Sequence, residues 1–170
     1  MRWLKIRTIP NHRLHHRAGA STCGRCKKGG SEDEAIGRSR GGLSTKINIS
    51  VDAHGNPVRF ILTPGQVHDI LQAEDLISGF PFENLLADMG YDSDRFRACI
   101  AERGAEAVIP SSRSRSQAIA YDKHTYGERN LVERFINKIK HFRRIATRYE
   151  KTALSFASML FLVGAMIWLR

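Results

Sequence analysis

Two runs of alternating apolar and polar residues, joined by a turn, constrain the fold of this chain more than any other feature. The first run covers residues 46–51 and the second covers residues 58–62. Between them, the segment Asp52–Pro57 combines Asp, Gly, Asn and Pro, which favour tight turns. An alternation with a period of two is typical of strands that bury one face. The pattern therefore predicts an antiparallel hairpin.

Shorter apolar segments follow the hairpin and alternate in type between helix and strand. In chain order they predict a helix near residues 71–77, a strand at 85–87, a helix between Asp92 and Gly104, a strand at 107–109, and helices over 126–148 and 152–169. This order is typical of α/β proteins in which a mixed sheet is flanked by helices.

Residues 1–42 differ in composition from the remainder of the chain. No Asp or Glu precedes Glu32, basic residues are frequent, and the segment ends in a run of Gly, Arg and Ser at residues 37–42. We expect residues 1–42 to be a basic, poorly ordered leader and residues 43–170 to form one domain. A faint alternation of Leu4, Ile6 and Thr8 allows one short strand within the leader.

The charge and the cysteine content limit the partners and the compartment. The formal net charge of +10 favours a polyanionic partner, with nucleic acid as the first candidate. Three cysteines and no signal-peptide pattern indicate the cytoplasm. Residues 153–169 are apolar, but their 17 residues fall short of the roughly 20 needed for a membrane span. We expect a buried core helix there, with a membrane anchor as the alternative.

A zinc site in the leader is a second alternative. Cys23 and Cys26 are separated by two residues, and His12, His15 and His16 lie upstream. Because there is only one Cys pair and the histidines are clustered, we favour an unstructured basic segment over a zinc site.

The helix predicted over residues 126–148 presents one polar face. At about 100° per residue, Tyr126, Arg129, Glu133 and Lys140 share this face, and Arg144 returns to the same line. A carboxylate among cations suits the binding of phosphate groups. The alternative is a solvated helix face that is held by ion pairs one turn apart.

These four residues match the Tyr-Arg-Glu-Lys signature at its full spacing, and the chain resembles the bacterial insertion-sequence DDE transposases. The resemblance extends from about Lys27 to the end. Further segments that look like this family are Gly37–Ile47, the Gly55-Asn-Pro turn, Leu62–Gln66 with His68-Asp69, Ala87–Asp92 and Phe142–Tyr149.

The resemblance implies an RNase H-like fold in which two aspartates and one glutamate bind two divalent ions, Mg²⁺ or Mn²⁺. By position, Asp88 is the second aspartate and Glu133 the glutamate, each both catalytic and metal-binding. Asp88 also ends a buried apolar strand, although a helix-cap or turn aspartate is the alternative. Two ions clamp the attacking and leaving oxygens of a phosphoryl transfer.

The resemblance also implies the partners. These are DNA, as terminal repeats and as target, with self-association allowed and no small-molecule substrate expected. The residues expected to bind DNA are Tyr126, Arg129, Lys140 and Arg144.

The first aspartate of the family is absent from the place where the resemblance puts it. It is expected on a strand before the hairpin, usually followed by a small hydroxyl residue, but residues 8–22 contain no acid. Glu32, Asp33, Glu34 and Asp52 are poorly placed substitutes. We therefore predict that the first strand is missing or replaced and that the metal site is incomplete.

This absence also bears on the activity of the chain. We expect little or no activity, because one of the three metal ligands is missing. We also predict that residues 1 to about 26 come from a truncated or frame-shifted start. The alternative is a non-catalytic, basic DNA-binding module that interferes with an intact transposase.

Overall fold

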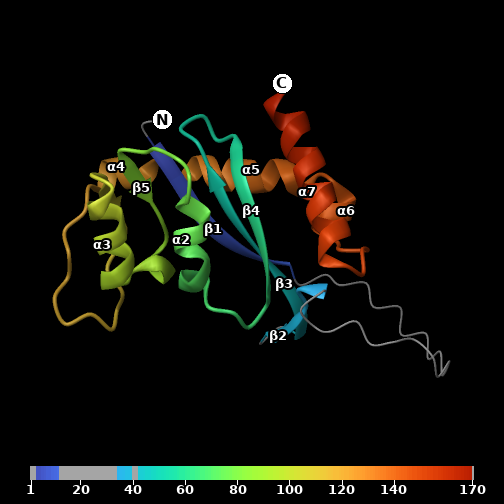
Figure 1. Cartoon of the computed structure of the whole chain (residues 1–170), viewed down its shortest axis with the longest axis horizontal. Coiled ribbons are helices and arrows are strands. Elements are labelled where there is room, and N and C mark those ends of the chain that lie inside the picture. The colour runs from blue at the N-terminus through green and yellow to red at the C-terminus, as the bar shows by residue number, and fades with distance from the viewer. Residues whose placement is uncertain (1–2, 12–33, 40–41, 170) are drawn as a thin grey trace.

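The structure is a computed structural model that describes residues 3–11, 34–39 and 42–169 (Figure 1). Its strands are β1 Trp3–Asn11, β2 Gly37–Ser39, β3 Gly42–Val51, β4 Pro57–Pro64, β5 Asn84–Leu86 and β6 Glu106–Val108. Its helices are η1 Asp69–Gln72, α2 Ala73–Ile77, η2 Met89–Tyr91, α3 Asp94–Glu102, α4 Lys123–Gly127, α5 Asn130–Lys140, α6 Arg143–Ala146 and α7 Ala153–Trp168.

The strands form one mixed sheet. Strand β3 pairs antiparallel with β1, β2 and β4, whereas β1 runs parallel to β5 and β5 parallel to β6. The sheet therefore joins an antiparallel half, built from the predicted hairpin, to a parallel half. This arrangement confirms the predicted RNase H-like class, a mixed sheet flanked by helices.

The central position in the sheet is taken by β1, where the sequence predicted a missing or replaced first strand. Leu4 and Ile6 are fully buried, so the faint alternation at the start of the chain does mark a strand. The prediction that the whole of residues 1–42 is a poorly ordered leader is wrong for β1 and β2, which pair within the sheet. The residues of the zinc alternative, His12, His15, His16, Cys23 and Cys26, lie outside the described residues.

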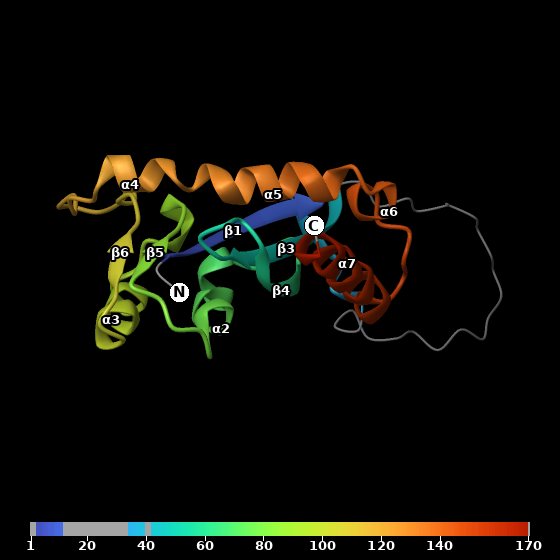
Figure 2. The same ribbon diagram turned by 90° about the horizontal axis from the view of Figure 1, so that it is seen from above.

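Helices cover both faces of the sheet. Figure 2 shows α4 and α5 end to end along one face, with α2 and α3 on the other and α7 beside β4. One buried cluster unites Leu4 and Ile6 of β1 with α2 and α3. A second cluster unites Ile47 and Ile49 of β3 with α5 and α7. Successive residues of a strand point to opposite faces, so β1 contributes to both layers.

The hairpin turn forms as predicted. Gly55 has φ of 84°, a value that favours glycine, and the Asp52 carboxylate accepts hydrogen bonds from the backbone amides of His54 and Asn56 at 2.9 and 2.8 Å. Because Asp52 is used in the turn, it does not supply the missing carboxylate.

The helix predicted over residues 126–148 is divided into three. Helix α4 ends at Gly127, α5 ends at Lys140, and the extended backbone of Phe142 (ψ 104°) separates α5 from α6. The carbonyl of Phe142 then accepts hydrogen bonds from the amides of Ile145 and Ala146, which begins the new helix. The break turns α6 away from the axis of α5.

Helix α7 packs through one side only. Phe156, Leu160 and Val163 are buried, and Gly164 lies so close to the Phe60 ring that an added Cβ would be 3.1 Å from it. The opposite side, with Leu154 at 78% exposure, faces outward, so the predicted core helix is buried along one stripe. Within the part of the chain that the structure describes, none of the helices combines the length and apolar character that crossing a membrane requires.

A lysine is buried in the middle of the sheet. Lys5 of β1 is 1% exposed, and its Nζ lies 4.0 Å from the carboxylate of Glu128, which is mostly exposed. Burial lowers the pKa of Lys5, and the negative charges of Glu128 and Asp52 oppose this shift. A charge that is removed from water with so distant a partner contributes little to stability.

We expect Lys5→Met to leave the free energy of unfolding unchanged or to raise it, by no more than about 4 kcal/mol, as measured by urea denaturation. The lowered pKa means that the unfolded chain holds this proton more tightly, so the cost of the buried charge falls as pH rises. The difference between the two proteins should therefore shrink toward about pH 10. Lys138→Met, at an exposed position of α5, is the control; a clear loss of stability in Lys5→Met alone would contradict this account.

Candidate functional site

Asp88 and Glu133 reach the same place from different elements. Asp88 lies two residues after the end of strand β5, and Glu133 lies in the first turn of α5. The side chain of Asp88 makes no capping hydrogen bond to η2, so the helix-cap interpretation fails. The two side chains are 33% and 41% exposed, which leaves both accessible from solvent.

The signature residues of the α4–α5 segment join the two carboxylates. Arg129 donates hydrogen bonds to Asp88 Oδ1 and, at 3.1 Å, to Glu133 Oε1. The Tyr126 hydroxyl donates to Asp88 Oδ1 at 3.5 Å, and burial raises the pKa of this tyrosine, which keeps its proton. The structure thus brings Tyr126, Arg129 and Glu133, which their spacing placed on one helix face, together with Asp88, which the resemblance assigned to the same site.

A second guanidinium, which the sequence analysis did not single out, lies at the same place. Arg7 of β1 contacts Glu133 Oε1 through Nη1, and its Nε lies 3.7 Å from Asp88 Oδ2. The two carboxylates therefore contact the same pair of arginines, Arg7 and Arg129. The signal that could have found Arg7 was its place between Ile6 and the hydroxyl residue Thr8 in the faint strand.

The remaining two predicted DNA-binding residues differ in how they lie relative to this cluster. Lys140 lines a cavity of about 210 Å³ together with Arg7 and Glu133, so it borders the cluster. Arg144 does not continue the polar helix face predicted for it. The helix is interrupted at Phe142, and Arg144 belongs to the separate helix α6. Its Nε is 3.9 Å from Glu150, and its side chain is 66% exposed.

A chain of polar groups ties β1 to the segment that carries Asp88. The buried Tyr91 hydroxyl is 2.5 Å from Thr8 Oγ1, and Thr8 donates to Asn48 Oδ1 of β3 at 2.7 Å. Burial raises the pKa of Tyr91, so its hydroxyl stays neutral. These bonds cross from the end of β5 through β1 to β3 and hold the three strands in register beside the site.

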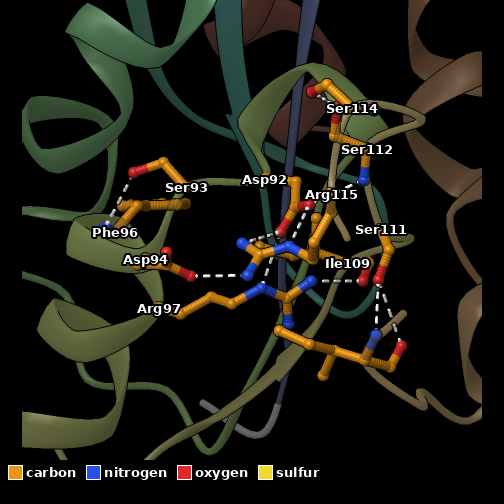
Figure 3. Close-up of polar contacts among 11 residues, drawn as sticks. Asp92, Ser93, Asp94, Phe96, Arg97, Ile109, Ser111, Ser112, Ser114 and Arg115 are labelled. Carbon is orange, nitrogen blue, oxygen red and sulfur yellow. Dashed lines mark hydrogen bonds and ion pairs between the residues drawn. The ribbon is translucent and has the colours of Figure 1, made fainter. Parts of the chain in front are cut away.

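The segment after Asp88 is also held by a buried ion cluster. Figure 3 shows Arg97 of α3 and Arg115 of the loop after β6 pointing toward Asp92. Their Nε atoms lie 2.8 and 3.0 Å from its carboxylate, which is 0% exposed, and the amide of Ser112 donates to it at 2.6 Å. Burial by itself raises the pKa of Asp92, but these bonds outweigh it and lower the pKa to about 2.

Comparison with known proteins identifies the family to which this chain belongs. A family model described as the transposase DDE domain matches residues 12–168. The chain belongs to the DDE transposase family. The match begins one residue after β1 ends, and includes every predicted site residue from Asp88 to Arg144.

Two curated relatives of this transposase-family chain come from insertion sequences. A protein described as a transposase for insertion sequence element IS6501, from Brucella ovis, is 43% identical over 130 residues, which are 75% of this chain and 100% of the relative. One for element IS402, from Burkholderia cepacia, is 34% identical over 64% of this chain, which spans 55% of that relative. The piggyBac transposase in a synaptic complex with hairpin DNA is weakly similar, with a TM-score of 0.47 and 12% identity over 68% of this chain and 24% of its own.

Members of the DDE transposase family carry out DNA transposition and depend on divalent metal ions, and the residues present here can be compared with that requirement. Within the described residues, no group of three or more His, Cys, Asp or Glu side chains is placed to hold a metal ion. Asp88 and Glu133 converge, but both contact Arg7 and Arg129. The carboxylates that converge among the described residues therefore do not by themselves fit a two-ion centre.

We expect Asp92→Ala to lower the free energy of unfolding by about 3 to 5 kcal/mol, because it leaves two arginines facing a buried site without their carboxylate. The carboxylate has a lower pKa in the folded chain than in the unfolded one, so its contribution is present above about pH 4 and is lost as pH falls toward 2. Urea denaturation at neutral and acidic pH measures both effects. Asp94→Ala, which removes an 84% exposed partner of Arg115, should cost less than about 1 kcal/mol; equal losses would contradict the role of Asp92.

Proposed function

We propose that this chain binds DNA at the edge formed by Asp88 and the α4–α5 segment and that it performs little or no strand cleavage there. The observation that carries the proposal is that Asp88 and Glu133 converge as a pair, without a third carboxylate among the described residues. Family membership supports DNA transposition as the process, and the incomplete cluster argues against its chemical step.

The electrostatics of the edge support DNA binding. The net charge of +10 gives the chain a general affinity for a polyanion. At the site, the hollow of about 210 Å³ lined by Arg7 and Lys140 offers cationic groups to a phosphate. Arg129 and the Tyr126 hydroxyl lie at the same edge and would position the backbone without reading its sequence.

The same edge lacks what phosphoryl transfer requires. In a two-ion mechanism, carboxylates hold two cations about 4 Å apart, which activate the nucleophile and stabilise the leaving oxygen. Two carboxylates whose charge is already balanced by two arginines attract such cations poorly. A chain that binds DNA in this way would occupy the sites of an active transposase, which is the interfering role considered as the alternative.

The origin of residues 1 to about 26 in a frame shift stays a prediction. The family match begins at residue 12, so it includes residues 12–26, which the prediction assigned to the altered start, and leaves β1 outside. Reading the other two frames of the genomic DNA upstream tests the idea: transposase-like sequence carrying an aspartate is the expected result.

Lys140→Ala should weaken binding to a fluorescein-labelled duplex of mixed sequence and reduce the slope of log affinity against log salt by about 1, because one phosphate contact is lost. Fluorescence anisotropy at several salt concentrations measures both. Arg95→Ala, on α3 at the opposite face of the sheet, is the control and should change neither. Equal effects of the two variants would show that binding is diffuse and that this edge has no special part in it.

Purified protein should not nick supercoiled plasmid or cleave terminal-repeat DNA in the presence of Mg²⁺ or Mn²⁺, because the cluster cannot hold both ions. Gel analysis of the products measures this. The proposal is overturned if metal-dependent cleavage is seen in the wild-type protein and is abolished by Glu133→Ala.

A further inference from the structure

We infer that Arg7 stands at the position in the chain where the third carboxylate would be, and that its guanidinium group fills the space of a divalent cation. The single substitution Arg7→Asp would then create a metal site. The inference rests on the proposed function, because it concerns the same edge. It goes further because it attributes the lack of metal binding at this site to one residue of β1, Arg7. Arg7 directly precedes residues 8–22, which contain no acid.

The strand register places Arg7 beside Asp88. Strands β1 and β5 run parallel, with Leu4 opposite Leu85 and Lys5 opposite Leu86. Extending this register by two residues, past the end of β5 at Leu86, places Arg7 alongside Asp88. A residue in this position meets both Asp88, in the connection after β5, and Glu133 of α5, as the contacts of Arg7 show.

The guanidinium of Arg7 already uses the oxygens that a metal ion would need. Asp88 Oδ1 accepts from Arg129, Asp88 Oδ2 lies 3.7 Å from Arg7 Nε, and Glu133 Oε1 contacts both arginines. Three carboxylate oxygens thus face guanidinium groups. Two negative and two positive side chains leave the cluster with no net charge, whereas oxygen-ligated divalent cations need an excess of carboxylates.

The guanidinium group of Arg7 excludes a metal ion from this position. A guanidinium is a hydrogen-bond donor with no acceptor atom, so it cannot serve as a ligand to a metal ion. A divalent cation entering the cluster would be repelled by Arg7 and Arg129 together. We therefore expect the wild-type chain to bind no divalent ion at Asp88 and Glu133.

Exchange of Arg7 for aspartate changes both the charge and the space. The charge of the cluster becomes more negative by two units, and the shorter side chain vacates the region between Asp88 and Glu133. Three carboxylates, from β1, from the end of β5 and from α5, then face one another. Such an oxygen-only set suits Mg²⁺ and Mn²⁺.

The test measures Mn²⁺ binding to the full chain without DNA, by calorimetry and by the electron paramagnetic resonance signal of free Mn²⁺. Arg7→Asp should bind Mn²⁺ at least tenfold more tightly than the wild type, and adding Glu133→Gln to this variant should abolish the gain. Arg113→Asp, with the same charge change on the exposed loop after β6, should gain nothing. Circular dichroism establishes that each variant is folded.

Arg7→Ala provides a second readout that does not depend on a new ligand. Removal of the guanidinium alone should raise the Mn²⁺ affinity above that of the wild type, and Asp88→Asn should reverse the increase. The inference is overturned if the wild type binds Mn²⁺ in an Asp88-dependent manner, or if neither folded Arg7 variant gains affinity. Either result leaves the proposed DNA binding standing, because that is measured separately by anisotropy and its salt dependence.

Discussion

The pairing of β1 between β3 and β5 is the constraint on which the remaining structure depends. This strand joins the antiparallel hairpin to the parallel half of the sheet, with Leu4 and Ile6 on one face and Lys5 and Arg7 on the other. Its parallel register with β5 brings Arg7 beside Asp88, and the packing of α5 across the same face brings Glu133 to both. Without β1, the sheet would be divided and the two carboxylates would have no common neighbour.

The face of β1 that α4 and α5 cover is unusual for a central strand. It carries two cations in succession, the buried Lys5 and the partly buried Arg7, and each meets a glutamate of the helical segment, Glu128 or Glu133. Central strands normally present apolar residues, because a charge removed from water is costly unless it is paired. Arg7 contacts Glu133 directly, whereas Lys5 Nζ lies 4.0 Å from Glu128, so the two cations differ in how much they contribute to the stability of the fold.

Polar clusters on either side keep the site in a fixed geometry. The Tyr91, Thr8 and Asn48 bonds tie the end of β5 to β1 and β3, and the buried Asp92 ties the same connection to α3 and to the loop after β6. Both clusters are shielded from water, so their bonds are stronger than they would be at the surface. They hold the short connection that begins with Asp88, whose own side chain makes no local capping bond.

Much of this architecture could be predicted from local patterns. A period of two marked the hairpin, and apolar runs marked the strands β5 and β6 and the helix α7. The spacing of Tyr126, Arg129 and Glu133 placed them on one face of a helical segment. Ser93 caps α3, accepting a hydrogen bond from the Phe96 amide. These features depend on neighbours within a few residues, which the sequence displays directly.

Other features were decided only by the tertiary structure. The pattern of β1 was too short and too basic to indicate a central strand, because its stability comes from partners some 40 and 80 residues away in the chain. The break at Phe142 removed Arg144 from the predicted line. The meeting of Arg7 with Asp88 and Glu133 likewise depends on register between distant strands. Sequence alone thus determined which residues could form elements and carry charge, whereas long-range pairing decided which charges meet, since no local pattern records a partner so far along the chain.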